Sequence, residues 1–217
     1  DDCGGTGTET VTFTLTDECG NFITQDATFT IVDTTDPTWS VAPADMLTVE
    51  CDPATNAAAF STWLLSFSGT DTCGSGTALV TDNSTGLSDD CGGTGTETVT
   101  FTLTDECGNF ITQDATFTIV DTTDPVWTNA PDNMTVECDG AGNTAEFAAW
   151  LTSFSGDDVC ASASVTHNSV GLSDDCGETG FETVTFTLTD ECGNFITQDA
   201  TFTIEDTTPA LIACPGD

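Results

Sequence analysis

One long segment of this chain repeats without a single change: residues 1–37 recur as residues 89–125. A third copy begins at Asp174, ends near Pro209, and differs mainly at Glu178, Phe181 and Glu205. Self-similarity at a fixed spacing of this size is the signature of a tandem array of small domains. We therefore expect similar domains in series rather than one large fold.

The sequence Asp-Thr-Thr-Asp-Pro at residues 33–37 and 121–125 marks the predicted boundaries, because proline stiffens a joint and limits strand and helix continuation. The chain then divides into four predicted parts: the C-terminal half of a repeat (1–36), two complete immunoglobulin-like repeats (37–124 and 125–208), and the start of the next repeat (209–217). Because the chain opens in the middle of a repeat and shows no signal peptide, we expect a mature fragment of a longer protein.

Threonine alternates with apolar residues through most of each repeat, which is typical of strands because β-branched side chains suit a pleated, half-exposed surface. Residues 96–105 alternate strictly, with Val99, Phe101 and Leu103 on one face. A turn at 106–109 leads into a returning strand over 110–120, with Ala115, Phe117 and Ile119 facing inward. Shorter strands are predicted over 46–50 and 77–83.

Residues 56–67 are predicted to form a helix, since Phe60, Trp63, Leu64 and Phe67 fall on one stripe at helical spacing. We expect Asn56 to cap its start, Gly69 to stop it, and a capping box to join Asn143 and Glu146 in the next repeat. The predicted fold is mainly β: tandem immunoglobulin-like β-sandwich domains, each with one short helix and two disulfides.

The charge balance excludes several classes of partner. The chain has no lysine or arginine and 37 acidic residues, a formal net charge of -37. No cation is available to neutralise a phosphate, so nucleic acid and anionic surfaces are excluded as direct partners. No apolar run approaches the length of a membrane span, so direct membrane insertion is not expected. The expected partners are neighbouring repeats of the same chain and other filament strands.

Eleven cysteines without a CxxC pair indicate disulfides formed in an oxidising, extracellular place. Each complete repeat holds four, which allow three connectivities. Cys91 and Cys107 flank the long strand, whose ten residues span roughly 33 Å, too far for a disulfide. Tracing the strand directions through the repeat favours Cys51–Cys91 and Cys73–Cys107, with Cys138–Cys176 and Cys160–Cys192 in the next repeat. Cys3, Cys19 and Cys214 are left without assigned partners.

The string Val-Thr-Phe-Thr-Leu-Thr-Asp-Glu-Cys-Gly-Asn, followed by a strand and Asp-Thr-Thr-Asp-Pro, resembles the HYR-like immunoglobulin-type repeats of large Bacteroidota surface proteins. Gliding-motility adhesins are among these proteins. The resemblance covers essentially the whole chain, three times over, and implies a secreted, cell-surface filament used for attachment or motility. It also implies O-glycosylation at Asp-Thr-Thr motifs, which places candidate sugars on Thr34, Thr122 and Thr207.

Acidic and amide side chains crowd the expected junctions between repeats. Hard oxygen ligands in such numbers suit Ca²⁺, which binds six to eight of them. The hypothesis is that Ca²⁺ neutralises each cluster and stiffens the joint; the alternative is a solvated acidic surface with diffuse counterions. The third junction lacks the second aspartate of the motif. The candidate ligands are Asp1, Asp2, Asp33, Asp36, Asp105, Glu106 and Asn109 at the first junction, and Asp89, Asp90, Asp121, Asp124, Asp190, Glu191 and Asn194 at the second.

An enzyme is not expected. His167 is the only histidine, it replaces Asp82 of the sister repeat, and an exposed strand position is predicted for it. Two other functions remain open. The repeats are either a rigid, disulfide- and Ca²⁺-stabilised spacer in a highly acidic extracellular filament or adhesin, or they bind a glycan or ice directly through the flat face of Thr98, Thr100, Thr102 and Thr104. Duplication of nearly identical copies favours the spacer.

Overall fold

The computed structural model describes residues 3–173, 175 and 177–210, and these form two compact units. Of the described residues, unit 1 comprises those within 3–49, 54–88 and 95–119, and unit 2 comprises those within 50–53, 89–94 and 120–210. Three short segments of the repeat 37–124, namely 50–53, 89–94 and 120–124, thus belong to unit 2. Compact units and sequence repeats do not coincide, and the repeat boundaries stay a prediction.

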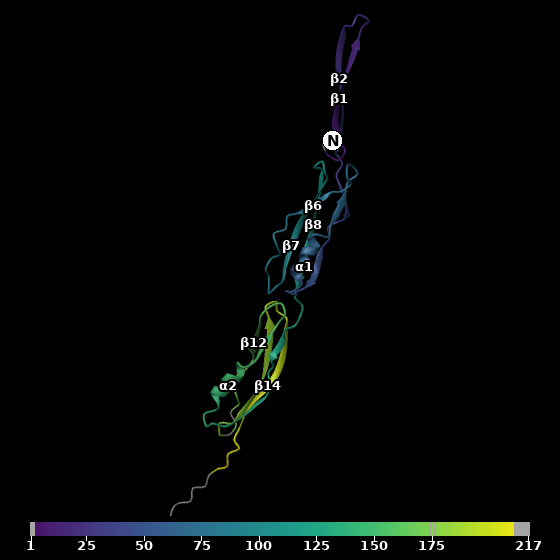
Figure 1. Ribbon diagram of the computed structural model, residues 1–217. Coiled ribbons are helices and arrows are strands. Elements are labelled where there is room, and N and C mark those ends of the chain that lie inside the picture. Colours follow the sequence, from purple (N-terminus) through teal and green to yellow (C-terminus); the bar gives the residue numbers. More distant parts are fainter. Residues whose placement is uncertain (1–2, 174, 176, 211–217) are drawn as a thin grey trace, which may run out of the picture. The chain divides into compact units, whose positions relative to one another are not determined.

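Unit 1 contains a separate hairpin and one complete set of elements (Figure 1). The hairpin pairs β1 with β2, and a four-stranded sheet has the order β4-β8-β7-β6, while β3 pairs with β5. The elements are β1 (Gly7–Thr16), β2 (Phe22–Ile31), β3 (Thr38–Val41), β4 (Met46–Glu50), α1 (Asn56–Leu64), β5 (Ser68–Thr70), β6 (Leu79–Asp82), β7 (Gly95–Thr104) and β8 (Phe110–Val120), of which Glu50 and Val120 are counted to unit 2.

Unit 2 repeats the same arrangement. Its four-stranded sheet has the order β10-β14-β13-β12, and β11 pairs with β9. The strands β10 and β14 run parallel, and the other pairs are antiparallel. The elements are β9 (Val126–Asn129), β10 (Met134–Glu137), α2 (Thr144–Leu151), β11 (Ser155–Asp157), β12 (Ala163–His167), β13 (Gly180–Asp190) and β14 (Phe195–Glu205).

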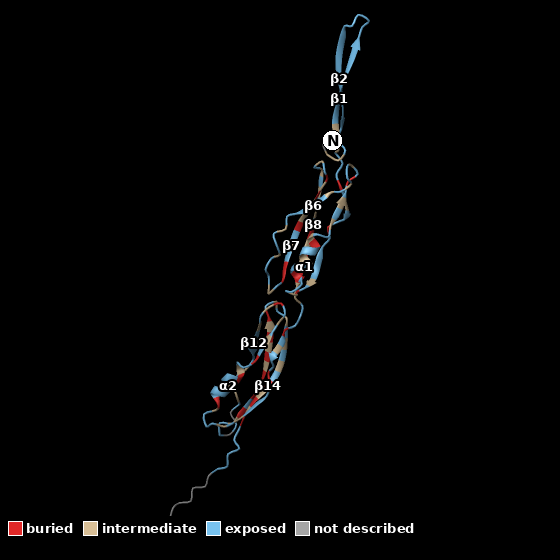
Figure 2. Ribbon diagram, in the orientation of Figure 1, coloured by how far each residue is buried: buried red, intermediate tan, exposed pale blue. Residues whose placement is uncertain are grey.

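The core of each unit lies between the inner face of the four-stranded sheet and the helix. Phe101 and Phe117 are fully buried, and the ring of Trp63 from α1 packs on both, with centroids 5.3 and 5.4 Å away. The Trp63 indole N–H donates to the carbonyl of Ala44 at 2.9 Å, so the one polar atom of the ring is satisfied. Figure 2 shows buried residues along β7 and α1 of this unit. The predicted mainly β fold with one short helix per repeat is confirmed, and the four-stranded and two-stranded sheets of each unit fit the predicted β-sandwich.

A glycine in the shortest strand of each unit permits close packing over the sheet. A Cβ on Gly69 would lie 2.2 Å from Leu103 Cδ2 and 2.8 Å from the Thr38 carbonyl oxygen. A Cβ on Gly156 would lie 2.1 Å from Leu188 Cδ2. Only glycine leaves room for the leucine beneath these strands, because real Cβ contacts are much longer.

The long strands and the strand over 46–50 were predicted closely, whereas the helix ends were not. α1 ends at Leu64 rather than Phe67, because the N–H and hydroxyl of Ser66 both donate to the Trp63 carbonyl and turn the chain. Gly69 therefore lies in β5 instead of stopping the helix. Thr55, not Asn56, is the N-cap.

The capping box at α2 is also wrong. Asn143 is the N-cap residue, but its side chain makes no capping hydrogen bond. The Asn143 amide instead donates to the Glu137 carbonyl at 3.0 Å, and its oxygen accepts from the Asp139 N–H at 3.1 Å. This side chain ties the incoming loop to strand β10, so it is not free to cap the helix.

Candidate cation site and disulfides

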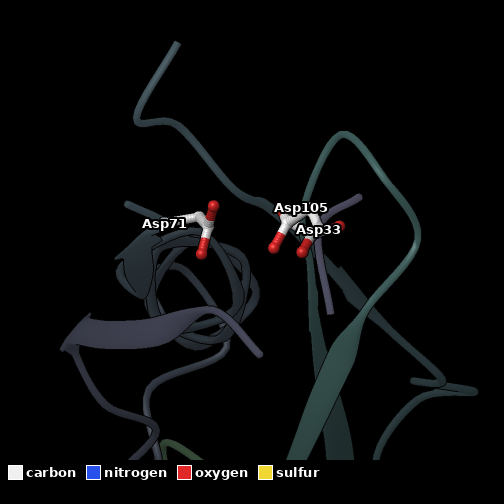
Figure 3. Close-up of side chains that lie close together, drawn as sticks. All are labelled: Asp33, Asp71 and Asp105. Atoms are coloured by element: carbon white, nitrogen blue, oxygen red, sulfur yellow. The ribbon is translucent and has the colours of Figure 1, made fainter. Parts of the chain in front are cut away.

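Three aspartates converge in each unit. In unit 1 one carboxylate oxygen from each of Asp33, Asp71 and Asp105 lies within 4.8 Å of the other two, and Figure 3 shows Asp71 facing the adjacent pair Asp33 and Asp105. In unit 2, Asp121, Asp158 and Asp190 form the equivalent cluster with the same limit of 4.8 Å. We call these the acidic trios. Their recurrence at equivalent positions makes them a feature of the repeat.

In each trio, the aspartate of the turn after the long strand, Asp105 or Asp190, is held by hydrogen bonds within that turn. Asp105 follows β7, and its Oδ1 accepts the N–H groups of Cys107 at 2.8 Å and Asn109 at 2.9 Å. The Asn109 amide donates to the Asp105 Oδ2 at 2.8 Å. In unit 2 the equivalent Asp190 Oδ2 accepts from the Asn194 amide at 2.9 Å. The Asp-x-Cys-Gly-Asn turn thus fixes its own aspartate.

The same asparagines bring the linker to the turn. The Asn109 amide also donates to the Asp33 carbonyl at 3.4 Å, and the Asn194 amide donates to the Asp121 carbonyl at 3.3 Å. Asp33 and Asp121 follow the last strand of a repeat, whereas the turns belong to the repeat that comes after. Each trio therefore combines a linker residue with residues of the following repeat.

The remaining aspartates of the two trios, Asp71 and Asp158, were not predicted from the sequence. The Asp71 carboxylate accepts the Cys73 N–H at 2.6 Å, and the Asp158 carboxylate accepts the Cys160 N–H at 2.7 Å. A signal was available, because these aspartates stand two residues before a cysteine, as Asp105 does. An aspartate at this spacing can bond the cysteine N–H and hold a tight turn.

One carboxylate oxygen in unit 2 has no partner. Asp121 Oδ2 is buried and has no hydrogen-bond partner in the described part of the chain. Desolvation by burial, followed by the charges of Asp158, Asp190 and Glu50, raises the pKa of Asp121 above its ordinary value. A buried acceptor without a donor costs free energy, and repulsion within the trio adds to that cost.

The pKa of Asp105 shifts in the opposite direction. Desolvation by burial is the largest contribution and raises its pKa, but hydrogen bonds from Asn109, Gly108 and Cys107 together hold the pKa of Asp105 below its ordinary value. This carboxylate therefore stays ionised in the trio. Three carboxylates offer up to six oxygens, the donor type that Ca²⁺ prefers, and the chain has no lysine or arginine to neutralise them.

Only part of each predicted ligand set comes together. Asp36, Asp89, Asp90 and Asp124 are exposed and lie in neither trio. Glu106 and Glu191 instead accept hydrogen bonds from the hydroxyls of Ser75 and Ser162. Asn109 and Asn194 orient the trio aspartates through their amides. The predicted ligands Asp1 and Asp2 fall outside the described residues.

The disulfides connect different repeats. The structure forms Cys3–Cys107, Cys51–Cys160 and Cys91–Cys192, with Cα atoms 5.1, 5.8 and 5.3 Å apart. Each bond lies inside one compact unit, yet each joins cysteines of successive sequence repeats. Cys19, Cys73 and Cys138 form no disulfide among the described residues.

The predicted pairs Cys51–Cys91, Cys73–Cys107 and Cys160–Cys192 are therefore wrong, while the exclusion of Cys91–Cys107 is confirmed. The strand tracing correctly put Cys51 and Cys91 at one end of the repeat, since a Cβ on Gly93, beside Cys91, would lie 3.0 Å from the Cys51 sulfur. The error was to pair cysteines within a repeat because their number is even. Both of these cysteines bond the following repeat instead. The predicted pair Cys138–Cys176 includes a residue outside the described ones.

The candidate glycosylation sites and the threonine face both contain hydroxyls in hydrogen bonds. Thr122 donates to Glu50 at 3.0 Å and Thr207 donates to Glu137 at 2.7 Å, whereas Thr34 is exposed. On the sheet, the Thr98 hydroxyl is 3.0 Å from that of Thr116 and Thr100 donates to Asp114 at 2.7 Å. The sheet thus uses part of its hydroxyl face for cross-strand pairing. Glycosylation of these threonines, and ligand binding by the face, stay predictions.

His167 is exposed at the end of β12, as predicted.

None of the helices in the described residues is long and apolar enough to cross a membrane.

No protein-family model matches the chain, and the search of curated proteins found no match. Solved structures with some similarity are cadherin ectodomains. The chain is 9% identical to mouse clustered PcdhgC3 EC1-3 with a TM-score of 0.35, covering 95% of this chain and 79% of that one. It is 10% identical to protocadherin gamma C5 EC1-3, with a TM-score of 0.32 and coverage of 91% and 77%.

The human desmocollin-1 ectodomain is 11% identical, with a TM-score of 0.29, and the match covers 92% of this chain and 47% of that one. TM-scores this low assign neither a function nor a partner to the chain. The resemblance to HYR-like repeats likewise stays a prediction.

Proposed function

We propose that the chain is the structural repeat region of a secreted, highly acidic extracellular filament or cell-surface adhesin. The repeats act as a rigid spacer, held by disulfides between successive repeats and by a divalent cation, Ca²⁺, in each acidic trio. Attachment or motility would be the role of the whole filament, in line with the resemblance to HYR-like repeats.

The buried Asp121 Oδ2, which has no partner among the described residues, is the observation that carries this proposal. An unpaired carboxylate oxygen beside two further carboxylates, as in unit 2, carries an electrostatic penalty that a bound cation would remove. Three carboxylates around one point supply the hard, anionic oxygen ligands that distinguish a Ca²⁺ site from a transition-metal site.

The cation would act on the linker. Asp121 follows β8, at the end of one repeat, whereas Asp158 and Asp190 belong to the following repeat. Without a cation, repulsion among the three carboxylates opposes the approach of the linker to the following repeat; with one, the same charges hold the linker in place. The disulfides Cys51–Cys160 and Cys91–Cys192 fix the same neighbourhood covalently.

The remaining properties support an exposed location. Several disulfides require an oxidising compartment. A chain without lysine or arginine offers trypsin-like proteases no cleavage site. A net charge of -37 keeps chains soluble and discourages association with anionic surfaces.

Small-angle scattering of the full chain tests the spacer function. The chain is measured in chelator, in Ca²⁺, and in K⁺ of equal ionic strength. We expect micromolar to millimolar Ca²⁺ to narrow the range of maximum dimensions that the chain samples in solution. K⁺ should leave that range unchanged. The double variant Asp33→Asn/Asp121→Asn should lose the response, while the exposed control pair Asp36→Asn/Asp124→Asn should keep it. An unchanged distribution in Ca²⁺, or an equal response of both double variants, would refute the cation-stiffened spacer.

A further inference from the structure

The same sequence occurs in two environments in unit 1. The hairpin β1–β2 and the pair β7–β8 share sequence and register, Gly7 opposite Ile31 in one and Gly95 opposite Ile119 in the other. In β7–β8 the inward side chains are covered by α1. In the hairpin the equivalent residues are exposed, and Figure 2 colours most of β1 and β2 accordingly.

Equivalent residues of the hairpin and of β7–β8 differ strongly in their exposed fraction. Phe13 is 60% exposed and Leu15 71%, whereas their equivalents Phe101 and Leu103 are 0% exposed. On the second strand Phe29 is 69% exposed against 0% for Phe117. A contiguous apolar face of this kind marks an interaction surface. A two-stranded hairpin is also at best marginally stable in water unless something packs on it.

In the complete repeat 37–124, known elements cover the equivalent face of β7–β8. Its cover is a strand beside β8, the helix α1 with the short segment that follows it, and a strand beside β7. The aromatic residues are Phe60, Trp63 and Phe67, whose rings pack on Phe101 and Phe117.

Polar contacts follow the same pattern. In the complete repeat the Gln113 amide donates to the Pro43 carbonyl at 2.6 Å, across to the covering segment. In the hairpin the equivalent Gln25 donates to the carbonyl of its own neighbour Asp26. The hairpin therefore has a polar anchor as well as an apolar face for a covering segment.

A cysteine at the end of the covering strand supplies an independent observation. The Cys51 N–H donates to the Val120 carbonyl at 2.7 Å, and the Cys138 N–H donates to the Glu205 carbonyl at 2.8 Å. The equivalent carbonyl of the hairpin is that of Val32. A covering strand on β2 would thus end with a cysteine at this residue.

The thiol that such a cysteine would meet is already in place. Cys160 bonds Cys51, and its equivalent in unit 1 is Cys73, which forms no disulfide among the described residues. The Cys73 sulfur lies 3.1 Å from the Gly4 carbonyl, in the loop that leads into β1. Cys160 meets the equivalent loop at Gly92, whose added Cβ would lie 2.8 Å from the Cys160 carbonyl oxygen.

We propose that the open face of β1–β2 receives the N-terminal half of another repeat, a strand ending in cysteine followed by an aromatic helix and a second strand, and that Cys73 bonds that cysteine. The two thiols are oxidised to one disulfide by exchange with a small-molecule disulfide such as oxidised glutathione. That molecule takes up two electrons and two protons and becomes two thiols. The inference does not depend on the cation proposal.

The test mixes the full chain with a synthetic polypeptide of residues 38–88 that carries Cys73→Ser, so that its only thiol is Cys51. The mixture is kept in a glutathione redox buffer with chelator present, which excludes any cation contribution. We expect one probe per chain, linked from the probe's Cys51 to Cys73 of the chain in a non-reduced digest. Binding should also reduce the fluorescence of an apolar dye on the chain.

Two controls make the result specific. A probe with Trp63→Asp should link at least 10-fold less, because its helix cannot bury a charge on the face. A chain with Phe13→Thr should bind the probe less, while unit 2 keeps its disulfides. Equal linkage of the two probes, or probe spread evenly over Cys19, Cys73 and Cys138, would overturn the proposal. Dimers of the intact chain formed through Cys73 without any probe would also overturn it, because they assign the face to a second whole copy.

Discussion

Cys51 is bonded to Cys160, 109 residues away in the next sequence repeat, with their Cα atoms 5.8 Å apart. Cys3–Cys107 and Cys91–Cys192 join equivalent cysteines of successive repeats. This second type of disulfide between repeats therefore recurs along the chain. Such bonds stabilise the connection between repeats as well as the repeats themselves.

The connectivity can be checked by mass spectrometry of a non-reduced digest with an acid-specific protease. We expect the three bonds of the structure and no Cys51–Cys91 peptide. Replacing Cys91 with serine should cost about 4 kcal/mol, because the Cys91–Cys192 bond closes a loop of about 100 residues. The control Cys19→Ser, at an exposed cysteine outside the described disulfides, should change stability by less than about 0.5 kcal/mol.

Asp121→Asn should stabilise unit 2 in chelator by about 1 kcal/mol, raising its melting temperature by about 4 °C, because it removes a charge that repels two neighbouring carboxylates and whose Oδ2 has no donor among the described residues. The same variant should lose most of the stabilisation that Ca²⁺ gives the wild type. Asp124→Asn, an exposed change in the same linker, should do neither.

The pH dependence of this difference has a definite sign. The folded-state pKa of Asp121 is raised, so between the unfolded and folded pKa values the folded chain holds more protons than the unfolded chain. In chelator, the stability of the wild type relative to Asp121→Asn should therefore fall as pH rises through that window, and stay low above it. A difference that is constant across acid and neutral pH would contradict the assignment.

Trp150 should be the most sensitive position of the unit 2 core. Its ring packs against Phe186 and Phe202, with centroids 5.2 and 5.5 Å away, and its N–H donates to the Asp132 carbonyl at 3.0 Å. Trp150→Ala should cost about 3–5 kcal/mol through cavity formation, measured by denaturant unfolding. Trp150→Phe should cost less and report the lost hydrogen bond. A loss below about 1 kcal/mol for Trp150→Ala would show that the helix does not cover the sheet.

Gly156→Ala should destabilise unit 2 by about 1–3 kcal/mol, because the new methyl group would overlap Leu188 and approach the Val126 carbonyl. Thermal unfolding measures the effect. The control Val159→Ala, at a side chain 69% exposed, should be nearly neutral. If both variants unfold at the wild-type temperature, β11 does not pack on the sheet at the distance described here.

Local patterns predicted much of the fold. Strict alternation located β7, β8 and their inward faces, because the period of two is set by the pleat itself. The strands β3 and β5 were not predicted, since three or four residues carry too little periodicity. The helix ends were predicted wrongly because other short-range hydrogen bonds, from Ser66 to the Trp63 carbonyl and from Asn143 to the Glu137 carbonyl, replaced the expected capping contacts.

The site was predicted only in part for a different reason. Asp33 with Asp105, and Asp121 with Asp190, were expected together from strand directions, and they do converge. Asp71 and Asp158 were not predicted, because they follow the unpredicted strands β5 and β11 and only their spacing of two residues before a cysteine marks them. The disulfide partners depended on which repeat faces each cysteine pair, and strand directions within one repeat do not contain that information.

Isothermal titration of the full chain with Ca²⁺ in low-salt buffer tests the central claim most directly. We predict two sites per chain, one for each acidic trio. Asp121→Asn should abolish one site, Asp33→Asn the other, and Asp124→Asn neither. Absence of binding heat with wild-type protein, or two sites that persist in the Asp33→Asn/Asp121→Asn variant, would contradict the account.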